Sequence, residues 1–220
     1  MSTSTIEHLN ASQLARHAFN VFLFSGRHQT GARLIYRALE LQPHNAEALR
    51  CLSDLLDSNG TEVFSGVVLE YALSEEPQFS VEERQTLDDL RFLAKWSWGF
   101  SSHTSGNPHL AQDAFADRSA FLVDDSRYQQ FLDQILTRTG SLEGGFKAAH
   151  TLCGAMAGFL QHGELGGKAG VVESLHPEQF QKTEVYSQWL QSPTDELDAL
   201  EKARLEKSKP TLKPRWKFWQ

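Results

Sequence analysis

Helix-ending residues recur in this chain at an interval of 34 residues, and that interval limits the fold more strongly than any other feature of the sequence. Pro43 is followed 34 residues later by Pro77, and Gly26 is followed at the same interval by Gly60. The apolar residues that keep the interval are Ala18 with Leu52, Phe22 with Leu56, and Ile35 with Leu69. A fixed period of this length is typical of stacked structural repeats.

Apolar residues between these markers fall at helical spacing, which predicts amphipathic helices joined in antiparallel pairs. Gly26 and Gly60 end the first helix of each pair, where the left-handed conformation costs glycine little. Pro43 and Pro77 end the second helix, because proline lacks a backbone donor and disfavours helix in the residue before it. The predicted core residues are Ala38, Leu52, Leu56, Leu69 and Ala72.

The units Ser12–Asn45 and Ala46–Phe79 resemble two consecutive tetratricopeptide repeats, and the resemblance continues more weakly over residues 80–161. The ending "ALELQPHN" is similar to the consensus of that family. The chain departs from the family pattern where Gly31 and Ser65 replace alanine, and where Phe19 and Ser53 replace glycine. The resemblance implies an all-α fold, with antiparallel helix pairs stacked as a short solenoid and followed by extra C-terminal helices and a flexible tail.

A third long helix is expected from Ser80 to Trp98, as a diverged repeat or a capping helix. Its expected apolar face consists of Val81, Leu87, Leu90, Leu93 and Ala94. Asn45 and Ser80 are placed to cap the helices that follow them. The chain thus divides into a lead (1–11), a repeat region (12–98), a linker with a short helix (99–125), a degenerate repeat with further helices (126–192), and a charged helix with a basic aromatic tail (193–220).

A helix predicted over Leu142–Leu160 contains Gly154 and Gly158. Glycine costs about 1 kcal/mol in a helix interior, so its presence favours a close approach of another helix. A ligand pressed against that backbone is the alternative interpretation. The last helices are expected over Pro177–Leu190 and Pro193–Lys207, and the second of these is strongly charged and predicted to be solvated.

Composition favours a soluble cytoplasmic protein, and its compactness suggests a bacterial one. The first ten residues carry no basic start and no apolar run of the kind that a secretory signal has. Cys51 and Cys153 lie among apolar neighbours and are expected to be buried thiols. The net charge is −7, although the last residues from Lys207 onward carry +5, so that the body is acidic. An acidic body argues against a nucleic-acid partner.

No motif in the sequence predicts catalysis, a metal site or a cofactor. The nine histidines form no helical pair with a carboxylate partner. The glycine-rich stretch His162–Gly170 lacks the spacing of a phosphate-binding loop. No serine or cysteine stands in a nucleophile motif. We therefore expect a protein that is not an enzyme.

Arginines recur with the same interval on the first helix of each unit, at Arg16, Arg50 and Arg84. Each is followed four residues later by a polar residue; the first two of these are Asn20 and Asp54. The family resemblance implies that this side of the helices lines a concave groove, where Arg16 and Asn20 are similar to a pair that holds a terminal carboxylate. Arginine suits this task because its planar fork donates two hydrogen bonds to a carboxylate.

Two features leave that assignment open. Cys51 stands where the second repeat of the resembled clamp would offer asparagine. Arg50 with Asp54, and Arg84 with Asp88, also fit ordinary surface pairs four residues apart. If the groove hypothesis holds, Arg16, Asn20 and Arg50 are expected to be accessible on one wall.

The C-terminal tail carries a second candidate motif. Its residues are Lys213, Arg215, Trp216, Lys217, Phe218 and Trp219. Tryptophan and arginine are frequent anchors in protein interfaces, and basic residues beside tryptophan also suit weak attachment to an anionic membrane surface. A disordered end without a role is the third interpretation.

Three functional hypotheses follow. The leading one is a protein–protein interaction module, an adaptor or assembly chaperone that holds an acidic or carboxylate-terminated partner segment in its groove. The second is a helical enzyme or ligand-binding domain over residues 100–192, which a pocket containing Glu143 and His150 would favour. The third is a membrane-peripheral scaffold attached through the tail.

Overall fold

The computed structural model describes residues 4–25, 27–58, 62–74, 78–104, 125–159, 181–182 and 184–209. The described chain is helical, with no strand in these ranges, which confirms the all-α prediction. The helices of the first half are η1 (Ile6–His8), α1 (Ala11–Ser25), α2 (His28–Leu41), α3 (Ala46–Ser58), α4 (Glu62–Ser74) and α5 (Val81–Thr104). Those of the second half are α7 (Asp125–Thr139), α8 (Leu142–Gly154), the π-helix η4 (Ala155–Phe159), α11 (Glu184–Leu190) and α12 (Asp195–Ser208).

The predicted ends of the first two helices agree with these bounds. Pro43 lies in the turn between α2 and α3, and α1 ends at the residue before Gly26. Gly26, Gly60 and Pro77 themselves lie outside the described residues. The last helix occurs close to its expected place, at α12, whereas α11 begins at Glu184 after a turn at Lys182 and so is shorter than the helix expected over Pro177–Leu190.

Side chains cap several helices at their amino ends. The Asn45 side chain accepts a hydrogen bond from the backbone N–H of Ala48 at 3.0 Å, as its position predicts. At the start of α5, the Glu83 N–H donates to Ser80 Oγ while the Ser80 N–H donates to the Glu83 carboxylate. This reciprocal pair satisfies two backbone donors that a helix end leaves unpaired.

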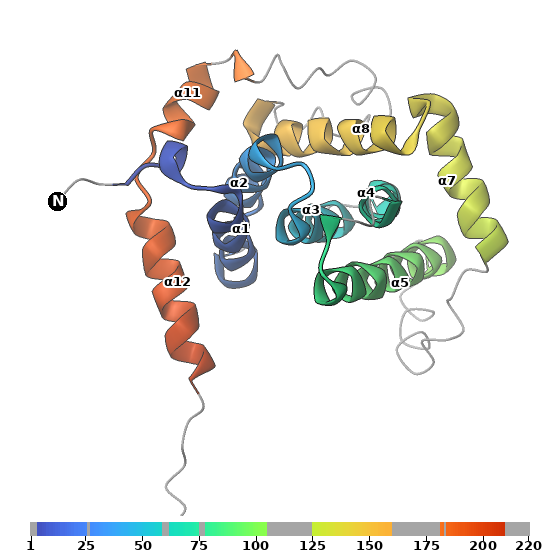
Figure 1. Cartoon of the computed structure of the whole chain (residues 1–220), viewed down its shortest axis with the longest axis horizontal. Helices are drawn as coiled ribbons and strands as arrows, with labels where there is room; N and C mark the ends of the chain where they lie inside the picture. Colours follow the sequence, from blue (N-terminus) through green and yellow to red (C-terminus); the bar gives the residue numbers. More distant parts are fainter. Residues whose placement is uncertain are drawn as a thin grey trace, which may run out of the picture.

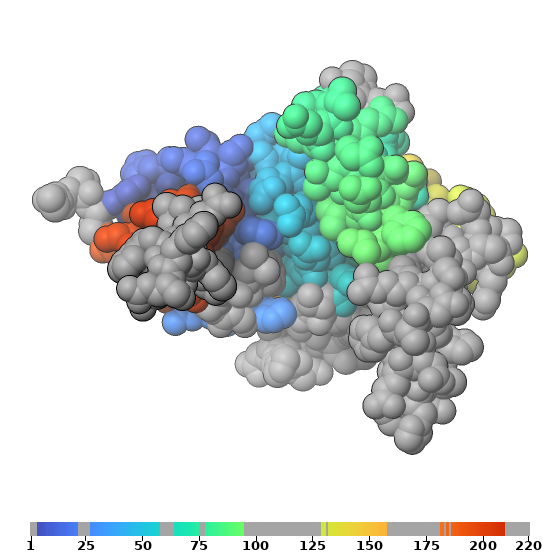
Figure 2. Space-filling model, turned by 90° about the horizontal axis from the view of Figure 1, so that it is seen from below, coloured from blue at the N-terminus to red at the C-terminus, as the bar shows by residue number. Residues whose placement is uncertain are grey.

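The first five helices pack in an order that follows the chain. α1 lies against α2, α3 lies against α4, and α5 lies against both α4 and α3. α1 also contacts α3, and α2 contacts α3, so that each pair is joined to the next. Figure 2 shows α1, α3 and α5 in blue, cyan and green across one face. We call this surface the α1–α3–α5 face.

The core runs through all these helices. Ala38, Leu52, Leu56, Leu69 and Ala72 are fully buried, which confirms the predicted register. One apolar cluster connects residues from η1 to α12. Cys51 and Cys153 are buried free thiols, also as predicted.

The predictions for α5 were wrong in two respects. The helix continues to Thr104, so residues 99–104, expected to belong to the linker, are helical. Leu87 and Ala94 are buried, but Val81 is 86% exposed and Leu93 is 51% exposed. The helix rests on α4 and α3 through a narrower stripe than its composition suggested. The short helix predicted after Asn107 lies outside the described residues.

The hairpin of α7 and α8 folds back over the earlier helices. A further stacked repeat would place this hairpin against α5, whereas α8 lies across α2 and α4 (Figure 1). Glycines allow that close crossing: a Cβ on Gly145 would lie 2.4 Å from Val67 Cγ1, and one on Gly154 would lie 2.9 Å from Tyr36 Cε2. Tight helix packing therefore accounts for Gly154, and the ligand alternative is not needed there.

The two ends of the described chain meet on the far side of α1. The Thr194 backbone N–H donates to the Ser4 carbonyl at 3.2 Å, and the Ile6 N–H donates to the Ser192 carbonyl at 3.3 Å. α12 then runs alongside α1 at the edge of the molecule (Figure 1). None of the described helices has the length and hydropathy required to cross a membrane.

Leu52→Ala is expected to lower the free energy of unfolding by ~2–5 kcal/mol, because Leu52 is fully buried between the helix pairs. The matched control is Leu93→Ala, since Leu93 is 51% exposed. Urea denaturation measures both. Equal effects of the two substitutions would contradict the packing described.

Gly145→Ala is expected to destabilise the protein by ~1–3 kcal/mol through overpacking against Val67. Val67→Ala removes the obstructing methyl groups, so the double variant should be more stable than the sum of the two single effects. A double-mutant cycle measured by thermal unfolding gives this coupling. Strict additivity would mean that α8 and α4 do not meet at these residues.

Candidate functional site

Two of the predicted groove residues lie where α12 packs against α1. The Arg16 side chain is 53% exposed, and its Nη1 lies 3.3 Å from Glu201 Oε1 on α12. Asn20 is 0% exposed, which contradicts its expected accessibility. It is covered from α12, because Arg204 Nη1 donates to Asn20 Oδ1 at 3.3 Å. The predicted peptide-binding position is thus occupied by a helix of the same chain.

Phe19 forms the connection between this contact and α3. The Arg50 guanidinium lies 4.8 Å from the centre of the Phe19 ring, and that of Arg204 lies 5.4 Å from it. Both distances are within the range of cation–π attraction. Phe19, which departs from the glycine usual in the resembled family, is therefore the side chain over which arginines of α3 and α12 converge.

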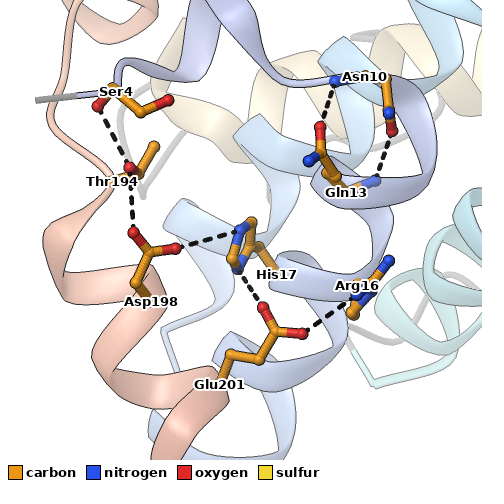
Figure 3. Close-up of polar contacts among 8 residues, drawn as sticks. All are labelled: Ser4, Asn10, Gln13, Arg16, His17, Thr194, Asp198 and Glu201. Carbon is orange, nitrogen blue, oxygen red and sulfur yellow. Dashed lines mark hydrogen bonds and ion pairs between the residues drawn. The ribbon is translucent and has the colours of Figure 1, made fainter. Parts of the chain in front are cut away.

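His17 is held between two carboxylates of α12 (Figure 3). Its Nε2 lies 3.9 Å from Asp198 Oδ1, and its Nδ1 lies 3.9 Å from Glu201 Oε2. Burial lowers the pKa of His17 below its usual value of 6.5; the carboxylates of Glu201 and Asp198 raise it, and Arg16 lowers it. Because burial is the largest of these effects, the imidazole is neutral at pH 7.

A small cavity opens between the two helices at this place. Its volume is about 240 Å³. Its lining residues are Ser4, Leu9, Gln13, Arg16, His17, Thr194, Asp198 and Glu201. Most of these carry polar groups, so the cavity suits a polar ligand better than an apolar one.

Polar groups at this contact are incompletely satisfied. Among the described residues, neither His17 Nδ1 nor Asn20 Nδ2 has a hydrogen-bond partner, although both atoms are buried. The 3.9 Å between His17 Nδ1 and Glu201 exceeds hydrogen-bond range. An unpaired buried donor or acceptor costs about 1–3 kcal/mol, so α12 is an imperfect complement to α1.

α12 is held to α1 mainly by weak interactions. The Arg27–Glu196 pair has both side chains more than half exposed, and pairs of that kind contribute about 0–1 kcal/mol each. Leu197 is the buried apolar residue of α12, and complete burial of a leucine contributes about 1.5–3 kcal/mol. The ion pairs weaken as salt screens them. This contact is therefore far less stable than the packing of the paired helices.

Arg84 lies elsewhere. It lines a cavity of about 510 Å³ between α4, α5 and the start of α8, together with Glu70, Asp88 and Arg91. Arg91 pairs with both acids there. The recurring arginines therefore have different surroundings: Arg16 pairs with Glu201, Arg50 lies over Phe19, and Arg84 lines a separate cavity.

Asp54 is partly buried beside Arg50 on α3. Burial raises the pKa of its carboxyl, while Arg50 acts in the opposite direction. The ion pair in which the structure places Arg50 is with Glu47, at 4.0 Å. Arg50 keeps part of its surface exposed, so it remains accessible beside Phe19.

The residues named for the enzyme hypothesis do not form one pocket. Glu143 is exposed and pairs with Lys147 at 2.6 Å. His150 instead stacks on Tyr36, with Nε2 3.0 Å from the Tyr36 carbonyl oxygen, and burial lowers its pKa. Burial also raises the pKa of the Cys153 thiol, which keeps this thiol protonated and unreactive.

A polar cluster fixes α11 against α2. The Tyr186 hydroxyl donates to Glu40 Oε2 at 2.5 Å, and Arg37 Nη1 lies 3.3 Å from both groups. Burial raises the pKa of Tyr186, so the phenol stays protonated and the bond is retained. These contacts position α11 against α2, although the buried Arg37 Nε has no hydrogen-bond partner among the described residues.

Other candidate features have the following outcome. Across the described ranges, no group of three histidine, cysteine or acidic side chains is arranged to hold a metal ion. The tail motif from Lys213 to Trp219 lies outside the described residues. Comparisons with protein-family models, with curated proteins and with solved structures gave no match.

Sequence reasoning identified the α1 half of this contact and missed the α12 half. Arg16 and Asn20 were selected by their spacing, but His17, Arg27, Glu201 and Arg204 were not. The acidic first turn of α12 was the sequence feature that could have indicated a contact with arginines. The high charge of this helix instead led to the prediction that it is solvated. Asn20 and Arg204 are 184 residues apart, and local periodicity carries no information about a contact at that separation.

Acidification from about pH 7.5 to about pH 5.5 is expected to lower the free energy of unfolding in part through His17. The pKa of His17 is lower in the folded chain than its usual value of 6.5, so the unfolded chain binds more protons as the pH falls. The stability that depends on neutral His17 is thus fully present above pH 6.5 and is lost as the pH falls below that value. Urea unfolding over a pH series measures it.

His17→Gln should flatten that pH dependence, because glutamine does not titrate. His8→Gln, at an exposed histidine of η1, is the matched control and should leave the dependence unchanged. If wild type and His17→Gln lose stability in parallel over this range, His17 is not the group responsible.

Proposed function

We propose that this protein is a helical-repeat interaction module, an adaptor or assembly chaperone of the cytoplasm. It binds an acidic segment of a partner protein on the α1–α3–α5 face. The residues that carry the binding are Arg16, Asn20 and Arg50, with Phe19 between them. The helices α1 to α5 form a short solenoid similar to tetratricopeptide repeats.

The order of helix contacts supports the solenoid. Each first helix lies against its own second helix and against the first helix of the next pair, as α1 lies against α2 and α3. Stacked repeats of this kind contact only their neighbours and offer an extended surface built from equivalent helices. Binding residues on such a surface recur with the repeat, as Arg16 and Arg50 do.

One observation carries the binding proposal: α1 already holds an acidic helix. On α1, Arg16 pairs with Glu201 of α12 and Asn20 accepts a hydrogen bond from Arg204. At the start of α2, Arg27 pairs with Glu196. The face therefore has the size, charge and hydrogen-bonding groups needed to receive a helical acidic segment. Arg50 extends the same cationic surface onto α3 and is only partly exposed, as an anchor residue requires.

Reversing both arginines, Arg16→Glu with Arg50→Glu, is expected to reduce capture of the native partner at least about tenfold, which corresponds to ~1.4 kcal/mol. The physical reason is like-charge repulsion of an acidic segment. Pull-down from the native cell, followed by quantification of the captured protein, measures the effect. Thermal unfolding checks that the variant remains folded.

Arg138→Glu is the matched control, because Arg138 is an exposed arginine in the last turn of α7. It reverses the charge of one arginine away from α1, half of the change made in the double variant, and should leave capture unchanged. Capture that survives the double reversal would leave Arg16 and Arg50 as surface ion-pair residues without a binding role.

A further inference from the structure

The surface of α12 that meets α1 is a single stripe. Its residues are Thr194, Leu197, Asp198, Glu201 and Arg204. Their spacing of three and four places them on one side of a helix. Apart from this stripe and the half-buried Leu200, the side chains of α12 are exposed, including Leu205. α12 is thus a short acidic helix with one contacting side, which is also the form that a bound partner segment would take.

α12 is tethered at its start and open toward its end. Thr194 is buried, and its hydroxyl donates to the Ser4 carbonyl at 3.2 Å. The bridge between Thr5 and Pro193 holds the same connection. From Lys202 to Ser208, every side chain except that of Arg204 is exposed. The helix can therefore leave α1 from its C-terminal end while its first residues stay attached.

The contact also leaves α1 with unused binding capacity. Among the described residues, Asn20 Nδ2 has no hydrogen-bond partner, although Asn20 is completely buried beneath α12. The buried His17 Nδ1 is likewise unsatisfied. A segment that placed a carboxylate or carbonyl oxygen beside Asn20 Nδ2 would satisfy a donor that α12 does not.

We propose that α12 is a tethered competitor that occupies the α1 surface in the free protein. The partner that displaces it is an acidic helical segment with an apolar residue followed four positions later by a carboxylate, as Leu197 is followed by Glu201. This inference rests on the proposed function, since it names the chemistry of the partner for the same surface. It adds that the surface is closed until that segment arrives.

Tethering explains why a weak contact suffices. A segment joined to its site by a short connection has an effective concentration in the millimolar range. If α12 is docked about 90–99% of the time, the apparent affinity for a competing segment falls by about 10–100-fold. A substitution that weakens the docking of α12 should therefore raise the apparent affinity for the competing segment by up to the same factor.

The test uses the full chain and a fluorescent peptide with the sequence Thr194–Ser208. The chain variant is Glu196→Gln with Glu201→Gln, which removes the carboxylates that pair with Arg16 of α1 and with Arg27 at the start of α2. The peptide should bind this variant at least about tenfold more tightly than wild type, by fluorescence anisotropy at low salt. Adding Arg16→Gln and Arg27→Gln to the variant should abolish binding.

The matched control is Asp195→Asn with Glu206→Gln, two exposed acids of α12 outside the contacting stripe. It makes the same change in net charge and should leave peptide binding at the wild-type level. Equal peptide affinity for wild type and the Glu196/Glu201 variant would overturn the proposal, and so would absence of binding to both.

A second measurement needs no variant. Raising the salt from about 0.05 to about 0.5 M screens the ion pairs and should accelerate amide hydrogen exchange in α12 of the wild-type chain. Exchange in α3, which is held by buried leucines, should stay constant. Exchange in α12 that does not respond to salt would show that α12 is a fixed part of the fold.

The outcomes separate this inference from the proposed function. In one outcome, the Arg16/Arg50 reversal loses partner capture while the Glu196/Glu201 variant binds the peptide no better than wild type. That outcome would support the interaction module and refute the competitor role of α12. In the opposite outcome, the Glu196/Glu201 variant binds the peptide more tightly while the Arg16/Arg50 reversal captures the partner normally. That outcome would support displacement of α12 and refute the proposed partner-binding surface.

Discussion

The described structure depends on the burial of one apolar stripe per helix against its neighbours. In α1 that stripe contains Leu14, Ala15, Ala18 and Val21, all buried. Once these residues face α2 and α3, helical geometry directs the side of α1 that carries Arg16, His17 and Asn20 away from the paired helices. That side cannot close on an apolar surface without leaving polar groups unpaired. Only a polar, acidic element can cover it, and in this chain α12 does so. The polar surface that α12 covers is therefore a consequence of which residues of α1 are buried in the core.

The crossing of α8 over α2 and α4 also depends on close packing of helices. Two helix backbones can approach closely only where side chains are small, and Gly145 and Gly154 supply those positions. The aromatic side chains fill the space beside them: His150 stacks on Tyr36 and Phe146 stacks on Tyr71. α8 thereby closes the side of the molecule that carries α2 and α4, whereas the α1–α3–α5 face has α12 at its α1 edge (Figure 2).

Local signals predicted the helices between Ala11 and Ser74, because periodicity, glycine and proline act within a few residues of where they stand. They failed at residues 99–104, since a segment rich in glycine and serine can continue a helix that has already begun. The Arg84 assignment failed for another reason. The apolar positions of α5 are shifted relative to the repeat, so that Arg84 turns toward α4 and α8. The burial of Asn20 depends on Arg204, and no local pattern reports a contact between residues so far apart.

The charge distribution of the chain bears on how selective the proposed binding surface would be. The chain carries a net charge of −7, so an acidic partner would be repelled by most of its surface. Arg16 of α1 and Arg27 at the start of α2 would instead attract such a partner, and α12 compensates both of them through Glu201 and Glu196. The net binding free energy of a competing segment is then only the difference between its own contacts with the surface and those of α12.

Nonspecific acidic chains gain little binding free energy when they displace α12, because they replace one exposed ion pair with another. A segment that also satisfies Asn20 Nδ2 and buries an apolar residue in place of Leu197 gains more. Specificity on this surface would thus come from the buried polar atoms that α12 leaves unpaired, and the arginines would supply attraction that many acidic chains share.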